Sequence, residues 1–196
     1  MATLGCTCLL SDSGLFFNKE RNLIIIVYVN DVLFLEANKR DISSLKERFM
    51  KIWECRDLGD TNEFLHMRIT RSKGCILIDQ KEYLQKVLQQ SNLINAKSIP
   101  TPLPEGYQPQ LNKGSPDPEI HASYQQVRGS LLYIMIGTQP DITYAVTKLS
   151  QFAVNPTQDH LDRALYICRY LLCTSEYALV FDGKSNEGLI AYTDSD

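Results

Sequence analysis

The sequence predicts an α+β protein, in which an antiparallel sheet with a packed helix precedes a small helical module and a terminal β-hairpin. Three observations lead to this class. Strand-favouring residues separated by turn signals fill the chain up to Leu35. Apolar residues recur at helical spacing after residue 119. Between the two, residues 97–119 hold six of the eight prolines, which indicates an extended connection and the best candidate domain boundary.

The centre of the predicted sheet is the stretch Leu23–Leu35, in which apolar and aromatic residues flank the polar pair Asn30-Asp31. Such residues favour a pleated, buried surface, and Asn-Asp tolerates a tight turn, so we expect a β-hairpin with Asp31 at its tip. Oxygen ligands on a rigid turn can hold a hard cation such as Mg²⁺. On spacing alone, an ordinary Asn-Asp turn is the alternative interpretation.

The residues on either side of this hairpin predict two short strands and one helix. Thr7–Phe17 contains two strand-like runs separated by a Ser-Asp-Ser-Gly turn. After the hairpin, Asn38 can cap a helix over roughly residues 39–51. The inward face of that helix is expected to hold Ile42, Leu45 and Phe49.

A second hairpin is expected from Glu63–Thr70 and Cys75–Ile78, with Gly74 in the turn between them. Asp79 and Glu82 have the spacing of a capping box, which predicts that the next helix opens at this point. The sequence therefore continues the α+β pattern as far as the prolines.

Three helices are expected after the prolines. Tyr124 belongs to the first, Thr138 starts the second and Asn155 starts the third. The chain then ends with two strand-like runs, Tyr177–Phe181 and Gly188–Thr193, which we expect to pair as the terminal hairpin.

Composition excludes several classes of protein. No apolar run approaches 18 residues, which argues against a membrane span, and the N-terminus lacks the pattern of a signal peptide. The six cysteines form no Cys-x-x-Cys pair and there are three histidines, so a zinc site or a disulfide framework is not expected. An intracellular location, cytoplasmic or nuclear, fits this cysteine usage. The net charge of −3 does not by itself indicate a nucleic-acid-binding protein.

The segment Tyr28-Val29-Asn30-Asp31 resembles the Y-V-D-D motif of reverse transcriptases, and its apolar flanks resemble the version found in copia-type retrotransposons. Asn30 departs from the motif, because the family has the first aspartate of the pair there. Other segments resemble the same family, in the family's order, along nearly the whole chain: Asp57-Leu58-Gly59, Phe64-Leu65-His66-Met67, Asp79-Gln80-Lys81-Glu82-Tyr83, Thr101-Pro102, residues 124–133, residues 137–142, Asn155-Pro156, residues 169–171 and residues 191–196.

At four more positions, this sequence has a residue that differs from the one usual in the family. His66 and Cys173 occupy positions where glycine is usual, Arg128 occupies a valine position and Gln139 replaces an arginine. Each motif by itself is weak. Their order and spacing together make the resemblance specific.

The resemblance also implies a domain organisation. Residues 1–96 correspond to the C-terminal part of a reverse transcriptase palm and thumb, and residues 97–119 to a Pro-rich connection. Residues 120–175 correspond to a helical connection module, and residues 176–196 to the start of a truncated ribonuclease H domain. The predicted sheet is then a palm-type sheet, and the helices form a small thumb and connection module.

Enzymes of this family hold two Mg²⁺ ions between an aspartate of an earlier palm strand and the motif pair. The resemblance therefore assigns catalytic positions to Tyr28, Asn30 and Asp31, and metal binding to Asp31 and, in the ribonuclease H part, to Asp194. It implies an RNA/DNA template–primer and the N-terminal part of the polyprotein as partners, no membrane, and no cofactor besides Mg²⁺.

The predicted function is that of an RNA-directed DNA polymerase fragment that is inactive alone. The earlier palm aspartate is expected to lie outside this sequence, and Asn30 lacks the charge that anchors Mg²⁺, so metal binding should be weak or absent. One alternative is a non-catalytic remnant that binds nucleic acid or another protein. Another is an unrelated α+β domain with an ordinary turn at Asn30-Asp31.

Overall fold

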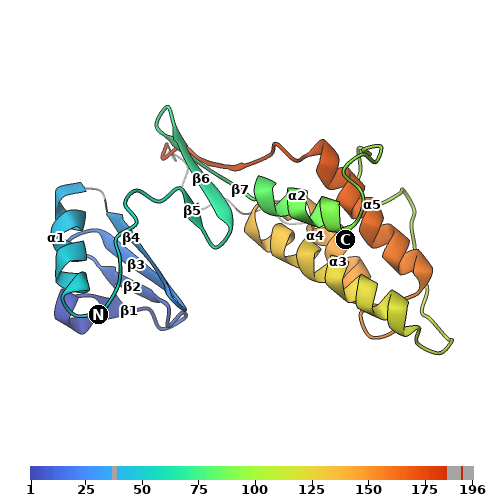
Figure 1. Cartoon of the computed structure of the whole chain (residues 1–196), viewed down its shortest axis with the longest axis horizontal. Helices are drawn as coiled ribbons and strands as arrows, with labels where there is room; N and C mark the ends of the chain where they lie inside the picture. Colours follow the sequence, from blue (N-terminus) through green and yellow to red (C-terminus); the bar gives the residue numbers. More distant parts are fainter. Residues whose placement is uncertain (37–38, 185–190, 192–196) are drawn as a thin grey trace. The chain divides into compact units, whose positions relative to one another are not determined.

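The computed structural model describes residues 1–36, 39–184 and 191, and the chain forms two compact units, Met1–Phe64 and Leu65–Asp196. Each unit contains one antiparallel sheet together with helices, which confirms the α+β class (Figure 1). Among the helices of the described residues, none is long and apolar enough to cross a membrane.

The first unit is an antiparallel meander with one helix against it. Its first four strands form one sheet in the order of the sequence, and each of them pairs with the next. The elements are a short 3₁₀ turn η1 (Ala2–Leu4), β1 (Thr7–Cys8), β2 (Leu15–Asn18), β3 (Leu23–Tyr28), β4 (Asp31–Glu36), α1 (Lys39–Met50) and, at the end of the unit, β5 (Glu63–Phe64). The sequence predicted all of these strands up to β4 and the helix, and the predicted cap Asn38 lies outside the described residues.

The core of this unit lies between the sheet and α1. Leu23 and Ile25 of β3 are 1% and 0% exposed, and Leu45 and Phe49 of α1 are 1% and 6% exposed. Phe49 also meets Phe34 of β4 edge-to-face, with ring centroids 5.3 Å apart. Because side chains alternate between the two faces of a strand, this packing fixes which face of β3 is buried.

The second unit begins with a hairpin. Strands β6 (Met67–Ser72) and β7 (Cys75–Asp79) pair through a tight turn at Lys73-Gly74, where both residues have left-handed φ angles of 50° and 83°. Strand β8 (Leu179–Phe181), which follows the helices in the sequence, pairs with β7 at the edge of this sheet. The predicted partner of this run, Gly188–Thr193, lies outside the described residues except for residue 191, so the expected terminal hairpin is untested there.

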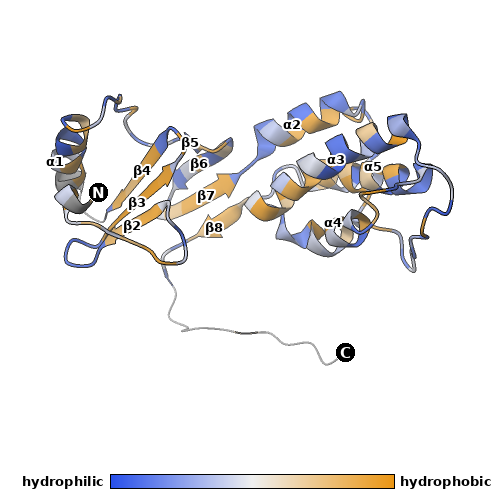
Figure 2. Ribbon diagram, turned by 90° about the horizontal axis from the view of Figure 1, so that it is seen from below, coloured by the Kyte–Doolittle hydropathy of each residue, from blue (hydrophilic) through white to orange (hydrophobic). Residues whose placement is uncertain are grey.

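Helices form the rest of the second unit. They are α2 (Lys81–Gln90), α3 (Pro118–Gly137), a 3₁₀ turn η2 (Pro140–Ile142), α4 (Thr143–Ser150) and α5 (Gln158–Cys173). Figure 2 shows that hydrophobic residues line one side of these helices while hydrophilic residues cover the other. The residues buried together include Leu84, Tyr124, Leu131, Ile134, Ile142, Val146, Ile167 and Leu171.

The expected helix boundaries after the prolines need correction. The second predicted helix does not start at Thr138, which is the C-cap of α3; the 3₁₀ turn η2 begins at Pro140 and α4 at Thr143. Asp117 caps α3 by accepting hydrogen bonds from the Glu119 and Ile120 backbone N–H groups, so the helix begins inside the Pro-rich segment. The third predicted helix begins after Thr157, whose side chain caps it, and not at Asn155. Proline at the first helical position of α3 needs no backbone donor, which explains why a proline-rich run can end as a helix.

The predicted capping box at Asp79 is also wrong. The N-cap of α2 is Gln80, one residue later, and its side chain makes no cap hydrogen bond. The Asp79 carboxylate instead accepts two hydrogen bonds from the Arg68 guanidinium, at 3.1 and 3.0 Å, and one from the Lys81 N–H at 3.1 Å. The carboxylate therefore joins the end of β7 to β6 as well as to the start of the helix.

The Pro-rich segment is not the boundary between the two compact units, which divide at Phe64-Leu65. Residues 97–117 form no helix or strand, as expected, but they are bonded to the helices of the second unit. The Tyr107 hydroxyl donates to Asp159 at 2.7 Å, and Arg169 donates to the Lys97 carbonyl at 2.9 Å. Proline content predicted the extended conformation, whereas side-chain contacts determine which unit the segment joins.

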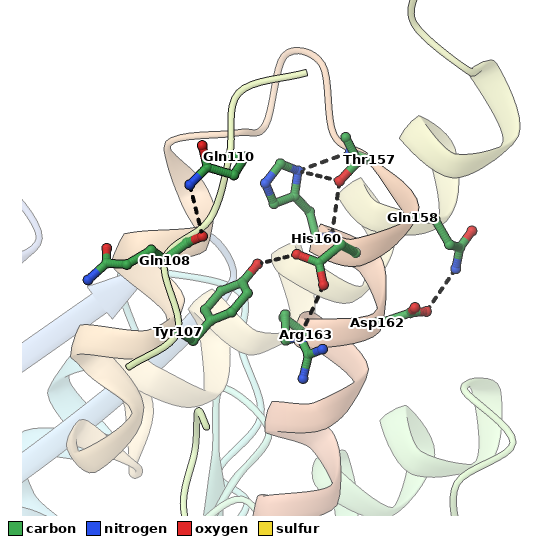
Figure 3. Close-up of polar contacts among 9 residues, drawn as sticks. Tyr107, Gln108, Gln110, Thr157, Gln158, His160, Asp162 and Arg163 are labelled. Atoms are coloured by element: carbon green, nitrogen blue, oxygen red, sulfur yellow. Dashed lines mark hydrogen bonds and ion pairs between the residues drawn. The ribbon is translucent and has the colours of Figure 1, made fainter. Parts of the chain in front are cut away.

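His160 connects the start of α5 to this Pro-rich segment. Its Nδ1 accepts a hydrogen bond from the Thr157 N–H at 3.0 Å, and Thr157 Oγ1 in turn accepts from the His160 N–H (Figure 3). The imidazole is fully buried, stacks on Phe152 with centroids 4.3 Å apart, and lies beside the Gln110 segment. Burial lowers the pKa of His160, and neighbouring Asp159 offsets part of that effect.

The first prediction follows from this buried imidazole. Because its folded-state pKa lies below the unfolded value of about 6.5, unfolding takes up a proton as pH falls through that range. The free energy of unfolding of the second unit should therefore decrease by up to about 1.4 kcal/mol per pH unit below about pH 6.5. Urea denaturation followed by circular dichroism at pH 7.5, 6.5 and 5.5 measures this slope.

The matched variants are H160Q and H66Q. His160→Gln removes the titrating group and should flatten the slope. Its amide oxygen can replace Nδ1 as the acceptor for the Thr157 N–H, so stability at pH 7.5 should fall by about 1 kcal/mol, through the lost stack on Phe152. His66→Gln, at an exposed position, should keep the slope of the parent chain. An undiminished slope in H160Q would show that another group is responsible.

Candidate functional site

The tip of the β3–β4 hairpin brings together three of the four predicted site residues, Tyr28, Asn30 and Asp31. The two-residue turn is Val29-Asn30, and Tyr28 pairs directly with Asp31. The turn is therefore one residue earlier than the predicted Asn30-Asp31 turn, and Asp31 is the first residue of β4. The fourth predicted residue, Asp194, lies outside the described residues.

Register explains the shifted turn. Six residue pairs join β3 to β4, from Leu23 with Glu36 to Tyr28 with Asp31. Moving the turn by one residue would shift the pairing by two residues, so that Ile25 would lie opposite Glu36 instead of Phe34, and Leu23 and Ile24 would lose their partners in β4. The apolar cross-strand pairs therefore favour the observed turn over the local preference of Asn-Asp.

Val29 has an uncommon backbone conformation for its residue type. Its φ angle is 52°, in the left-handed region, and its side chain is 83% exposed. A left-handed conformation costs an L-residue roughly 1–2 kcal/mol, and a β-branched side chain has no local hydrogen bond to offset that cost. The tip is therefore a strained turn that the paired strands hold in place.

The side chains of Tyr28 and Asp31 lie on the face of the sheet that is turned away from the core. Tyr28 shares its face of β3 with Ile24, because alternate residues point the same way, while Leu23 and Ile25 pack under α1. Tyr28 is 57% exposed and Asp31 is also exposed. The carboxylate thus stands at the end of an outward-facing sheet surface, accessible to ligands.

The tip supplies one charged oxygen ligand, the Asp31 carboxylate, and one neutral one, the Asn30 amide. Hard cations such as Mg²⁺ are held by several oxygen ligands at once, and affinity depends on their charge. Within the described residues, no group of three or more His, Cys, Asp or Glu side chains gathers closely enough to hold a metal ion. The tip thus offers one carboxylate and one amide oxygen, fewer than the several oxygen ligands that hold a hard cation.

Comparisons with known proteins identify the family of this chain. Residues 5–105, just over half of the chain, match the family described as reverse transcriptase (RNA-dependent DNA polymerase). The chain belongs to the reverse transcriptase family. Its relatives place it within the copia-type retrotransposon branch of that family.

The relatives are transposon proteins. A Retrovirus-related Pol polyprotein from transposon TNT 1-94 of Nicotiana tabacum is 34% identical over 188 residues, which cover 92% of this chain and 14% of the tobacco protein. The polyprotein from transposon RE1 of Arabidopsis thaliana is 30% identical over 200 residues, covering 100% of this chain and 13% of that protein. A putative transposon Ty5-1 protein of Saccharomyces cerevisiae is 30% identical over 187 residues, 94% of this chain and 60% of its own length. No solved structure matches the chain.

The chain spans about one seventh of the length of the plant polyproteins that it matches. The matched family region contains the whole β3–β4 hairpin together with β6, β7 and α2.

Local structure accounts for two of the departures from the family pattern. His66 has a φ angle of 57°, a left-handed conformation that glycine adopts without strain, so the usual glycine has a backbone reason. Gln139, in place of arginine, is 4% exposed and donates to the Thr174 carbonyl at 3.2 Å, at the C-terminal end of α5. Gln139 is therefore a buried residue that joins the chain after α3 to the end of α5.

The strain at Val29 generates the second prediction. Val29→Gly should raise the free energy of unfolding of the first unit by roughly 0.5–1 kcal/mol, because relief of the left-handed strain exceeds the entropy cost of glycine. The control is Val27→Gly, two residues earlier. Val27 is a partly buried strand residue, and its replacement should lower the free energy of unfolding of the first unit by about 1 kcal/mol or more. Chemical denaturation followed by Trp53 fluorescence measures both, and equal destabilisation by the two would contradict the assignment of strain.

Proposed function

We propose that this chain is the hairpin-bearing part of a copia-type reverse transcriptase and that the tip Tyr28–Asp31 belongs to its polymerase site. In this proposal, residues 1–96 are the end of the palm and the thumb, residues 97–119 are the connection, and residues 120–175 are the helical connection module. The observation that carries it is an exposed carboxylate, Asp31, at the end of a strand pair whose register the core fixes.

Asp31 would contribute one ligand to a divalent cation, which we take to be Mg²⁺ as in the wider family. When bound, the cation neutralises charge on the incoming nucleotide and helps to activate the primer end. The tip supports this by its rigidity, because Asp31 is paired within the sheet and its carboxylate is exposed. Tyr28, on the same face, would shape the surface beside the primer end of an RNA/DNA template–primer.

Asn30 weakens this site in the proposal. Its amide oxygen can contact a cation, but it lacks the charge of the aspartate usual in the motif. At the effective dielectric constants of protein surfaces, one unit charge at about 4 Å from another contributes roughly 1–4 kcal/mol. The remaining acidic ligands would come from the N-terminal part of the polyprotein, and the 196-residue chain alone should be inactive.

Residues 176–196 would be the first part of a ribonuclease H domain, with Asp194 as its first metal-binding acid. One such carboxylate without its companions cannot organise two-metal hydrolysis. We therefore propose that the isolated chain does not cleave an RNA–DNA hybrid.

The third prediction tests the polymerase proposal by primer extension on an RNA template with Mg²⁺. The 196-residue chain and its N30D variant should both fail to incorporate nucleotides. A chimera that joins the preceding segment of the tobacco TNT 1-94 polyprotein to residue 1 should gain activity when Asn30→Asp is present, by about tenfold or more over the Asn30 form. Adding Asp31→Ala should abolish that activity.

Controls separate the possible outcomes. The same length of the tobacco polyprotein, joined and purified in the same way, shows whether the assay supports extension at all. If that control is active and the N30D chimera binds template–primer without extending it, the chain is a non-catalytic binding remnant and the polymerase proposal is wrong. Incorporation by the isolated chain that disappears with Asp31→Ala would overturn the claim that it is inactive alone.

A further inference from the structure

A glycine outside the hairpin contacts the strand that carries the tip. Gly14 is the last residue of the Ser-Asp-Ser-Gly turn between β1 and β2, and its carbonyl accepts a hydrogen bond from the Val27 N–H at 2.8 Å. A Cβ atom on Gly14 would lie 2.7 Å from the Val27 carbonyl oxygen, closer than real Cβ atoms approach backbone oxygens. The backbone of Gly14 is not in the left-handed region, so this contact alone excludes a side chain.

The turn that presents Gly14 is itself fixed by hydrogen bonds. Asp12 Oδ1 accepts from the Gly14 N–H at 2.8 Å, and the Asp12 carbonyl accepts from the Leu15 N–H at 3.2 Å. The Leu9 N–H closes the turn on the Leu15 carbonyl at 2.8 Å. Gly14 therefore approaches Val27 from a turn of defined shape.

The contact between Gly14 and Val27 lies at the end of the pairing between β2 and β3. The β2–β3 ladder ends at Leu15 paired with Ile26, and the Gly14 bond extends it by one residue, to Val27. On its other side Val27 pairs with Val32 of β4. Val27 is thus held from both sides, directly before the strained turn at Val29.

We propose that Gly14 is a positioning residue of the polymerase site, which sets the orientation of the hairpin tip and hence of Asp31. The inference rests on the proposed function for the role of Asp31, while the coupling between Gly14 and the tip stands on geometry alone. A side chain at position 14 must push the Val27 carbonyl away. The Tyr28–Asp31 tip, which continues directly from Val27, moves with it.

The fourth prediction tests the coupling in the isolated 196-residue chain by ¹⁵N NMR. Gly14→Ala should shift the amide signals of Val27 to Asp31 and raise the hydrogen exchange rate of the Val27 N–H by about tenfold or more, with smaller changes in α1. Ser13→Ala, in the same turn, is the matched control and should leave these signals in place. Shifts confined to residues 11–15, or spread evenly through the first unit, would overturn the proposal.

A second variant covers the case in which Gly14→Ala does not fold. Asp12→Ala removes the side-chain acceptor of the turn without adding a clash. It should raise exchange at the Val27 N–H by a smaller factor, in the same region of the chain. Unchanged exchange there in D12A, if G14A is unfolded, counts against the proposal.

Kinetics in the chimera test the consequence for catalysis. In the chimera with Asn30→Asp, Gly14→Ala should lower kcat about a hundredfold and raise the Mg²⁺ concentration needed for half-maximal rate, without changing the Kd for template–primer. A purely structural role would lower the amount of folded enzyme without changing the metal dependence. If the Asn30→Asp chimera is inactive, the polymerase proposal fails, and the NMR measurement still decides whether Gly14 positions the tip.

Discussion

The pairing register of β3 is the constraint on which the first unit depends. Leu23 and Ile25 are fully buried beneath α1, and this burial determines which residues of β3 face outward. The same register places Tyr28 opposite Asp31 and the turn at Val29-Asn30. The apolar pairs along β3 and β4 therefore set the position of the carboxylate that we propose as a metal ligand, because a turn at another position would change those pairs.

Much of this architecture could be predicted from the sequence. The apolar runs on either side of Asn30-Asp31 predicted the hairpin, and the spacing of Leu45 and Phe49 predicted the helix packed on it, because both patterns reflect burial. The position of the turn could not be predicted locally. Asn-Asp favours a turn, but the gain from that preference is smaller than the loss of apolar cross-strand pairs such as Ile25 with Phe34.

Other features depend on contacts between residues far apart in the sequence. The capping spacing at Asp79 was misleading, because Arg68 on the neighbouring strand binds the same carboxylate. The prolines of residues 97–117 predicted extended chain but not its partners, since bonds such as Tyr107 to Asp159 join residues 52 positions apart. The importance of Gly14 could not be predicted either: only the folded chain places it against the Val27 carbonyl.

The place of β4 at the edge of its four-stranded sheet has a practical consequence. It is six residues long, reads Asp-Val-Leu-Phe-Leu-Glu, and carries its charges at the two ends and none between them. Natural proteins usually protect such edges with lysine, proline or a bulge, because an open strand can add to a strand of another molecule. Within the part of the chain that the structure describes, no strand pairs with the outer side of β4, so a lysine at Leu35, which is 41% exposed, is a suitable change to protect this edge against strand addition.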